Sequence, residues 1–242
     1  MILHRLALLV TGAALSACAT LPPDDPADPL ETVNRAVFGF NMTADHYVLK
    51  PVARTYVEVV PNVAQKAVVN FFGNLSEPIT IVNGVLQGKF LQASSDTGRF
   101  LLNSTFGIAG LVDVASKSGL PKHDEDFGQT LGHWGVGTGA YLMLPFLGPS
   151  NGRDLIGRGA DYFTDPLFYV QQNNDELEYW FYGLTGLNLV NTRARLLSAD
   201  ALIEGALDPY IFVRTAYLQS RLNKVYDGNP PKELLYGSFD DE

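Results

Sequence analysis

Cysteine is nearly absent from this chain, which has 242 residues and one cysteine, Cys18. A single cysteine cannot form a disulfide within the chain, and beyond it there is no thiolate for a metal site or for nucleophilic catalysis. The sequence also has neither the H-E-x-x-H pattern of zinc proteases nor a P-loop. These absences exclude several enzyme classes and leave Cys18 available for a different chemistry.

Long hydrophobic runs are missing as well. The longest run beyond the N-terminal region is AYLMLPFL at 140–147, whereas a membrane-spanning helix needs roughly 20 apolar residues. Basic residues are also scarce, with 17 Lys and Arg against 26 Asp and Glu and a net charge of −9. Such an acidic balance argues against nucleic acid as a partner and against docking on anionic headgroups through a polybasic patch.

The first 17 residues have the parts of a secretory signal peptide. A short basic start containing Arg5 is followed by an apolar run at 6–15. The run ends in the letters LSAC, which match the lipobox pattern of small residues before a cysteine. We therefore predict that residues 1–17 are removed and that Cys18 carries a covalent lipid. The alternative is an ordinary signal peptide with a chance cysteine.

The next residues indicate a destination and the start of the folded part. Ala19 is not the aspartate that commonly retains lipoproteins in the inner membrane, so the outer membrane is favoured. Residues 18–27 are rich in proline and aspartate and predict a flexible tether. Residues 28–226 predict a helical domain, and residues 227–242 predict a loose acidic tail.

Apolar residues recur at helical spacing over most of the domain, which predicts a mainly α fold. Asp28 should cap the first helix and Pro51 should end it. Gly73 should end the second helix, and Asp208 with Pro209 should open the last one. The expected helices span residues 28–49, 61–73, 76–86, 90–106, 174–184, 188–197, 201–207 and 208 to about 226.

One segment interrupts the helical pattern. Residues 128–159 contain nine glycines and the apolar run at 140–147, which predicts a strand or hairpin, or a loop that dips into a membrane surface. Gly135, Gly137 and Gly139 resemble a fragment of a dinucleotide-binding loop. Because the third glycine is misplaced and no helix follows, we do not predict a cofactor site.

The first predicted helix has two distinct faces. One face is apolar, and another carries Asn34, Phe38, Asn41 and Asp45, which mix amides, an aromatic ring and a carboxylate. Apolar helix faces usually pack in a core, but on a membrane-tethered protein they can also lie in the lipid interface. The pattern alone leaves both interpretations open.

Two other groups of polar residues are candidates for chemistry. His123, Asp126 and His133 could bind a metal in a periplasmic hydrolase, although the simpler interpretation of this segment is a polar loop. Arg193 and Arg195 should lie on one helix. They are either solvated partners of the many carboxylates, or at least one of them faces a lipid phosphate.

Six stretches of the sequence are informative when they are taken together. They are DPLETVNRAVFGFNMTADHYVLKPVA (28–53), VPNVAQKAVVNFFGNLSEPITIVNGVLQG (60–88), RFLLNSTFGIAGLVDVAS (99–116), DFGQTLGHWGVGTGAYLMLPFLGPSNGRD (126–154), TRARLLSADALI (192–203) and DPYIFVRTAYLQSR (208–221). Each stretch is weak alone, but together they cover nearly all of residues 28–221. They resemble the MlaA (VacJ) family of outer-membrane lipoproteins and occur in the family's order. One departure is Ala140, where the family often has proline.

The resemblance implies a ring of amphipathic helices in the inner leaflet of the outer membrane, around a central channel. It implies a protein without catalysis or cofactor that removes phospholipids from the outer leaflet and passes them to a soluble periplasmic carrier. Trimeric porins would be its membrane partners. The alternative is a structural lipoprotein that holds a porin or the cell wall, whose body would be soluble without its anchor.

The resemblance and the helical faces together suggest where the lipid would pass. The expected gate is a mobile loop, and its glycines are Gly135, Gly137 and Gly139. The residues expected to line the channel or contact lipid are Asn34, Phe38, Phe40, Asn41, Asp45 and Arg193.

Overall fold

The computed structural model describes residues 28–168, 178–232 and 234. The predicted signal peptide, Cys18, the tether and most of the predicted tail lie outside the described residues. The described fold is mainly helical, as predicted. Its elements are α2 (Glu31–Ala44), η2 (Asp45–Leu49), α3 (Lys50–Val59), α4 (Asn62–Leu86), α5 (Phe90–Thr105), α6 (Val114–Lys117), α7 (Phe127–His133), β1 (Tyr141–Leu144), β2 (Gly148–Asn151), α8 (Gly152–Asp161), α10 (Glu178–Arg195), η4 (Leu197–Ala199), α11 (Asp200–Glu204) and α12 (Pro209–Val225).

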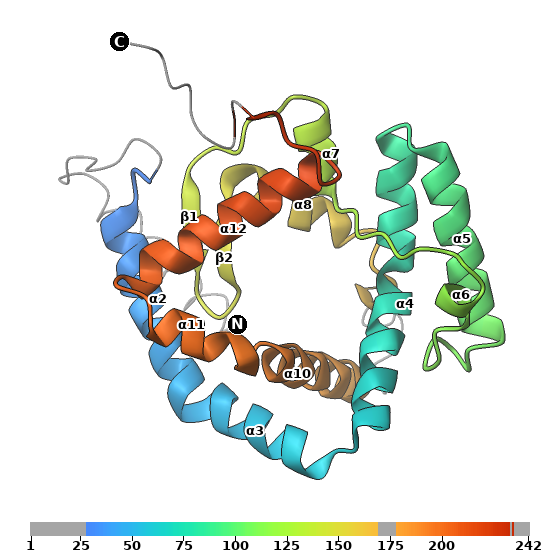
Figure 1. The fold of residues 1–242 in the computed structure, drawn as a ribbon, viewed down its shortest axis with the longest axis horizontal. Coiled ribbons are helices and arrows are strands. Elements are labelled where there is room, and N and C mark those ends of the chain that lie inside the picture. The colour runs from blue at the N-terminus through green and yellow to red at the C-terminus, as the bar shows by residue number, and fades with distance from the viewer. Residues whose placement is uncertain (1–27, 169–177, 233, 235–242) are drawn as a thin grey trace.

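The helices are arranged in a ring (Figure 1). α2, α3 and α4 follow one another round one side, and α7, α8 and α12 lie on the other. α10 runs along the inner side of α3, between α4 and α11, and contacts both α3 and α4. α5 packs against the outer side of α4. α10 therefore lies on the inner side of the ring, in contact with both α3 and α4.

The first helix differs from the prediction at both ends. Asp28 does not cap it, because α2 has no side-chain cap and the buried Asp28 carboxylate instead accepts a hydrogen bond from Asn34. The prediction that Pro51 ends this helix is wrong. A short π-helical segment, η2, joins α2 to α3, and the Lys50 N–H bonds to the Asp45 carbonyl across it. Pro51 then occupies the first turn of α3, where proline is tolerated.

Two predicted helix ends are also absent. α4 continues through Gly73, whose Cβ would lie 2.6 Å from the Lys122 Nζ, so this glycine permits a close approach rather than a helix end. α10 likewise runs unbroken from Glu178 to Arg195 across the expected gap at 185–187. By contrast, the opening of the last helix is confirmed, because the Asp208 side chain accepts hydrogen bonds from two backbone N–H groups of α12.

The glycine-rich segment contains the predicted hairpin. β1 and β2 pair antiparallel, with Tyr141 opposite Asn151 and Leu144 opposite Gly148. The inward side chains of β1, together with Tyr210 of α12, form a small buried apolar core, against which α2 packs. The hairpin is therefore held between the first and last helices of the described fold.

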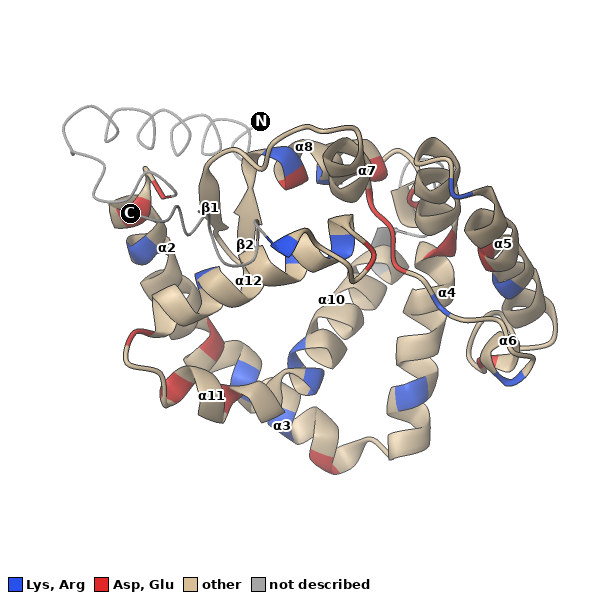
Figure 2. Ribbon diagram, turned by 45° about the horizontal axis from the view of Figure 1, so that its top comes forward, with Lys and Arg blue, Asp and Glu red and all other residues tan. Residues whose placement is uncertain are grey.

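Much of the apolar surface lies outside this core. Val63 and Leu91 are 81% and 89% exposed, and many other large apolar side chains are more than one-third exposed. Charge is sparse on α4, which has only Lys66 and Glu77 among its 25 residues (Figure 2). In the part of the chain that the structure describes, no helix has both the length and the hydropathy needed to cross a membrane.

α7 and α8 meet where two glycines bring their backbones together. A Cβ on Gly157 would lie 2.3 Å from the backbone nitrogen of Gly128, which the two helices cannot accommodate without moving. We expect Gly157→Ala to lower the free energy of unfolding by about 1–3 kcal/mol, because overpacking forces the helices apart. Urea denaturation of the purified protein in detergent measures this change.

Gly159 lies on the same helix and provides the matched control. A Cβ on Gly159 would meet nothing within 4 Å, so Gly159→Ala should be neutral or stabilise α8 by up to about 1 kcal/mol. Equal destabilisation by the two substitutions would contradict the assigned backbone contact.

Candidate functional site

Asn34 of α2 holds the edge of β1. Its Nδ2 donates to the Tyr141 carbonyl at 3.0 Å, and its Oδ1 accepts from the Met143 N–H at 2.8 Å. A second hydrogen from Nδ2 goes to the buried Asp28 carboxylate at 2.8 Å. The side-chain amide therefore takes the place of a neighbouring strand along the otherwise unpaired edge of β1.

Asn41 repeats this arrangement two helical turns later. Its Nδ2 donates to the Leu144 carbonyl at 2.9 Å, and its Oδ1 accepts from the Phe146 N–H at 2.8 Å. The Phe40 ring packs edge-on against the Phe146 ring, with centroids 5.1 Å apart. The tip of the hairpin is thus tied to α2 by one amide and one aromatic contact.

A cluster of charges lies where α2 passes into η2. Arg193 donates from Nε to Asp45 at 2.5 Å and from Nη2 to Asp200 at 2.9 Å. Lys50 lies 3.0 Å from the same Asp200 carboxylate. The hydrogen bond to Asp45 raises the pKa of Arg193 above its usual value. The end of α10 is therefore joined to the π-helical segment by charge-assisted bonds.

An apolar cavity of about 390 Å³ lies between α2, the hairpin and the end of α10. Four of the six predicted channel residues lie in its wall: Phe38, Asn41, Asp45 and Arg193. The other wall residues are mainly apolar, so the polar groups form only part of the surface. They are Met42, Ala44, Leu49, Met143, Phe146, Leu147, Gly148, Pro149, Leu189, Thr192, Leu196, Ala199, Asp200, Ile203 and Val213.

The other predicted residues lie outside this wall. Asn34 is 2% exposed and Phe40 is 49% exposed, and neither is among the wall residues. The three glycines of the predicted gate lie in the segment between α7 and β1. Gly135 and Gly139 have φ angles of +88° and +67°, which favour glycine, and a Cβ on Gly137 would meet nothing within 4 Å. Gating by this segment stays a prediction.

A second, polar cavity of about 430 Å³ lies between α4, the loop at 118–126 and α10. Thr192 is in the wall of both cavities, so they are adjacent across α10. Sequence reasoning singled out Arg195 and His123 but not this cavity, whose walls come from three separate segments. The wall residues are Val69, Phe72, Gly73, Ser76, Glu77, Thr80, Lys122, His123, Asp124, Asn188, Asn191, Thr192 and Arg195.

Glu77 is the buried acid of the polar cavity. Its side chain is 2% exposed, and its Oε1 accepts from the Arg99 Nε at 3.3 Å. Burial raises the pKa of Glu77, while the Arg99 guanidinium opposes this shift and Lys122 lowers the pKa slightly through its charge. The other carboxylate oxygen, Oε2, is buried without a hydrogen-bond partner.

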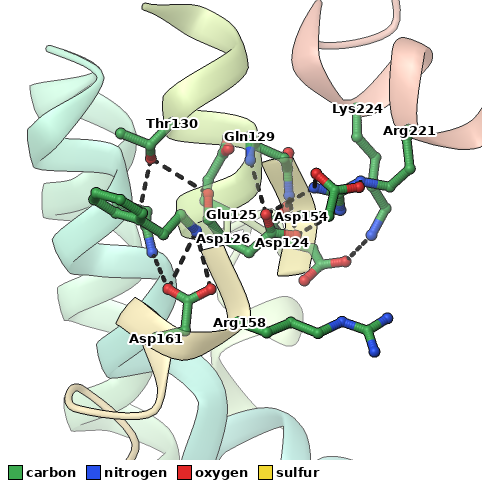
Figure 3. Close-up of polar contacts among 12 residues, drawn as sticks. Asp124, Glu125, Asp126, Gln129, Thr130, Asp154, Arg158, Asp161, Arg221 and Lys224 are labelled. Carbon is green, nitrogen blue, oxygen red and sulfur yellow. Dashed lines mark hydrogen bonds and ion pairs between the residues drawn. The ribbon is translucent and has the colours of Figure 1, made fainter. Parts of the chain in front are cut away.

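Two of the residues considered for a hydrolase site, Asp126 and His123, bond to different partners. Asp126 caps α7 and binds Arg221 of α12 through two hydrogen bonds of 2.6 and 2.8 Å (Figure 3). His123 bonds instead to the buried Asp96 at 2.7 Å. Although burial opposes it, bonding to Arg221 holds the pKa of Asp126 at about 2. Among the described residues, no group of three His, Cys, Asp or Glu side chains could hold a metal ion.

One further catalytic pattern lies at the second strand of the hairpin. Gly148-Pro149-Ser150-Asn151-Gly152 has the G-x-S-x-G spacing of a hydrolase nucleophile and joins β2 to α8. Ser150 is 0% exposed, and its Oγ is buried without a hydrogen-bond partner, whereas the nearby Tyr217 hydroxyl of α12 donates to Asp154. The buried hydroxyl therefore presents no accessible nucleophile in this structure.

Comparison with known proteins gives one consistent result. The family model described as "MlaA lipoprotein" matches residues 26–224. An Escherichia coli K12 protein named "Intermembrane phospholipid transport system lipoprotein MlaA" is 39% identical over 223 residues, covering 89% of this chain and 86% of that protein. The Haemophilus influenzae protein of the same name is 33% identical over 230 residues, covering 92% and 90%.

A solved structure matches the fold. It comes from a study named "Structural basis for maintenance of bacterial outer membrane lipid asymmetry", and it superposes with a TM-score of 0.72 at 38% sequence identity. The match covers 84% of this chain and 99% of the other. This chain therefore shares its fold with a solved structure to which it is also similar in sequence.

Proposed function

Because the chain belongs to the MlaA lipoprotein family, we propose that it removes phospholipids from the outer leaflet of the outer membrane and so maintains the lipid asymmetry of that membrane. The observation that carries this proposal is the mainly apolar cavity whose wall also includes polar groups, within a ring of helices. A phospholipid has the same division between apolar chains and a polar headgroup. No catalytic step is needed for such transfer.

Different residues in the wall of the apolar cavity would contact different parts of a phospholipid during transfer. Leu189, Leu196 and Val213 offer surfaces for acyl chains, because apolar contact is favourable wherever water is excluded. On the same wall, Asn41 offers hydrogen-bonding groups for the glycerol backbone, and the carboxylate-paired Arg193 borders the path of the headgroup. Passing lipid would compete with the hairpin for Asn41, which links transfer to the hairpin position.

We also propose where the body lies in the membrane. The sequence predicts a lipid on Cys18, and two or more acyl chains on one residue give stable anchoring. The exposed apolar side chains of the short helices would then enter the inner leaflet from the periplasmic side. This placement explains why so much apolar surface is exposed. It also requires no membrane-spanning helix, and the described residues contain none.

Two kinds of partner complete the proposed route. A trimeric porin would hold the lipoprotein in the outer membrane, and a soluble periplasmic carrier would accept the phospholipid. Such a carrier is needed because no acyl chain crosses an aqueous compartment unaided. Co-purification of the full-length lipoprotein with a porin tests the first of these partners.

The proposal predicts a rise in outer-leaflet phospholipid when the wall of the apolar cavity is altered. Asn41→Leu removes the amide that holds the hairpin tip, and Arg193→Ala removes the cation of the charge cluster. We expect each variant to raise outer-leaflet phospholipid toward the level of a strain without the gene. The measurement is the amount of phospholipid accessible to phospholipase added to whole cells.

Arg54→Ala is the matched control, because Arg54 is exposed on α3 and lies in the wall of neither cavity. Immunoblotting checks that all variants accumulate to similar amounts, and Arg193→Lys tests whether charge alone suffices. Wild-type phospholipid levels in both Asn41→Leu and Arg193→Ala would contradict the role of this cavity.

A further inference from the structure

Two positive side chains in the wall of the polar cavity form no salt bridge with a carboxylate. Among the described residues, Lys122 and Arg195 form no ion pair, although the chain carries a net charge of −9. Arg193, only two residues from Arg195 and facing the other cavity, binds two carboxylates. The contrast leaves the charges of Lys122 and Arg195 available to an anion within the polar cavity.

The same cavity has an acceptor that lacks a donor. The Oε2 atom of the buried Glu77 has no hydrogen-bond partner, and its Oε1 is bonded only to Arg99. Leaving a buried carboxylate oxygen unpaired is costly, so a donor that arrives with a ligand would be favoured there. A primary ammonium group has three such hydrogens and the opposite charge.

The neighbouring apolar cavity narrows the choice of ligand. Thr192 contributes to the walls of both cavities, so an apolar space lies directly next to the polar one. A ligand with a phosphate, an amine and acyl chains meets all of these features. Phosphatidylethanolamine is the common lipid of that chemistry.

We propose that the polar cavity binds the phosphoethanolamine headgroup of a phospholipid, with the phosphate between Lys122 and Arg195 and the ammonium at Glu77. This inference rests on the proposed function, since it assumes that phospholipid enters the ring. Inorganic phosphate shares the phosphate chemistry and is the competing occupant. The headgroup site is distinct from the charge cluster around Arg193, whose cation is already paired.

The test is isothermal titration of the full-length lipoprotein in detergent with three probes. The probes are dihexanoyl phosphatidylethanolamine, dihexanoyl phosphatidylglycerol and inorganic phosphate. We expect the double variant Lys122→Gln/Arg195→Gln to bind the ethanolamine lipid at least about tenfold more weakly, because it loses two charge-assisted contacts. Arg195→Gln alone, at an exposed position, should weaken binding in the same direction if the double variant folds poorly.

The matched control is Lys117→Gln/Arg54→Gln, which removes the same two charge types from positions outside both cavities. Its affinity should equal that of the wild type. The wild type should also bind the ethanolamine lipid several-fold more tightly than the glycerol lipid, because only the former has an ammonium for Glu77. Equal affinities for the two lipids would overturn the role of Glu77 without requiring any variant.

The remaining outcomes separate this site from the proposed function. Lipid binding that is unchanged in both Lys122→Gln/Arg195→Gln and Arg195→Gln overturns the headgroup site while leaving phospholipid transport intact. Inorganic phosphate that binds as tightly as the lipid overturns it in favour of a free-phosphate site. A wild-type protein that binds neither lipid contradicts the proposed function, and the headgroup site with it.

Discussion

Arg221→Gln should lower the free energy of unfolding by about 3–5 kcal/mol, the largest loss of stability that we expect from one substitution. The guanidinium of Arg221 bonds Asp126 at 2.6 Å and Asp154 at 3.0 Å, and its side chain is 11% exposed. Removing the cation leaves Asp126 without its counter-charge and Asp154 with only Arg153, at 3.3 Å, at the junction of α7, α8 and α12. Thermal unfolding should shift downward by on the order of 10 °C.

Lys224 lies one turn further along α12 and provides a matched control. It pairs with Asp124, whose side chain is 70% exposed, so this pair is largely screened by solvent. Lys224→Gln should therefore change the stability by no more than about 1 kcal/mol. Similar losses in the two variants would contradict the distinction between the buried and the exposed ion pair.

The same junction should respond to acid in a defined range. Because bonding to Arg221 holds the pKa of Asp126 at about 2, below its usual value, the charged form is favoured by folding. Its contribution to stability is complete above the ordinary aspartate pKa and is lost as the pH falls through about 2. In Arg221→Gln, the stability measured as a function of pH should no longer fall through this component of Asp126. A pH dependence of stability equal to that of the wild type would contradict the pairing of Asp126 with Arg221.

Asn34→Leu should be the second most damaging substitution, with a loss of about 3 kcal/mol or more. The amide of Asn34 serves Asp28, Tyr141 and Met143, all within a buried environment. Leucine has a similar size but leaves these groups without their partner, and each unsatisfied buried group costs about 1–3 kcal/mol. Urea denaturation monitored by circular dichroism measures the difference from the wild type.

Asn70→Leu is the matched control for this effect. Asn70 also donates to a backbone carbonyl, that of Leu111 at 3.2 Å, but the bond is exposed to solvent. Because water can replace that partner, we expect a loss below about 1 kcal/mol. An Asn34→Leu variant as stable as Asn70→Leu would show that the side-chain amide does not hold β1.

Features set by neighbouring residues could be predicted from the sequence. The apolar period over residues 90–106 predicts α5 within one residue at its C-terminal end, and the Asp208-Pro209 pair predicts the start of α12. The apolar run after the glycines predicts the hairpin. Each of these signals depends on contacts within one or two turns, which the local sequence contains.

The wrong predictions have causes that lie far away in the sequence. Gly73 looks like a helix end, but it makes room for Lys122, which is 49 residues further along the chain. Pro51 looks like a helix end because the wider turn of η2 has no recognisable sequence signal. Tertiary contacts decided both positions, so local preference was overruled.

The candidate site could be predicted only in part for the same reason. The stripe Phe38, Asn41 and Asp45 lies in one cavity wall because helical spacing places these residues on one face. Asn34 shares the stripe, but its partner is the backbone of β1, more than 100 residues away. The polar cavity joins α4, the loop at 118–126 and α10. The residues that line the polar cavity can therefore be identified only when the fold is known.

Native mass spectrometry of the full-length lipoprotein, purified from the outer membrane in mild detergent, tests phospholipid carriage most directly. We predict a population heavier by the mass of one intact phospholipid, in addition to the covalent lipid that the sequence predicts on Cys18. Arg193→Ala should reduce that population, whereas Arg54→Ala, outside both cavity walls, should retain it. A wild-type protein that carries no phospholipid, under conditions that preserve its fold, would contradict the proposed role.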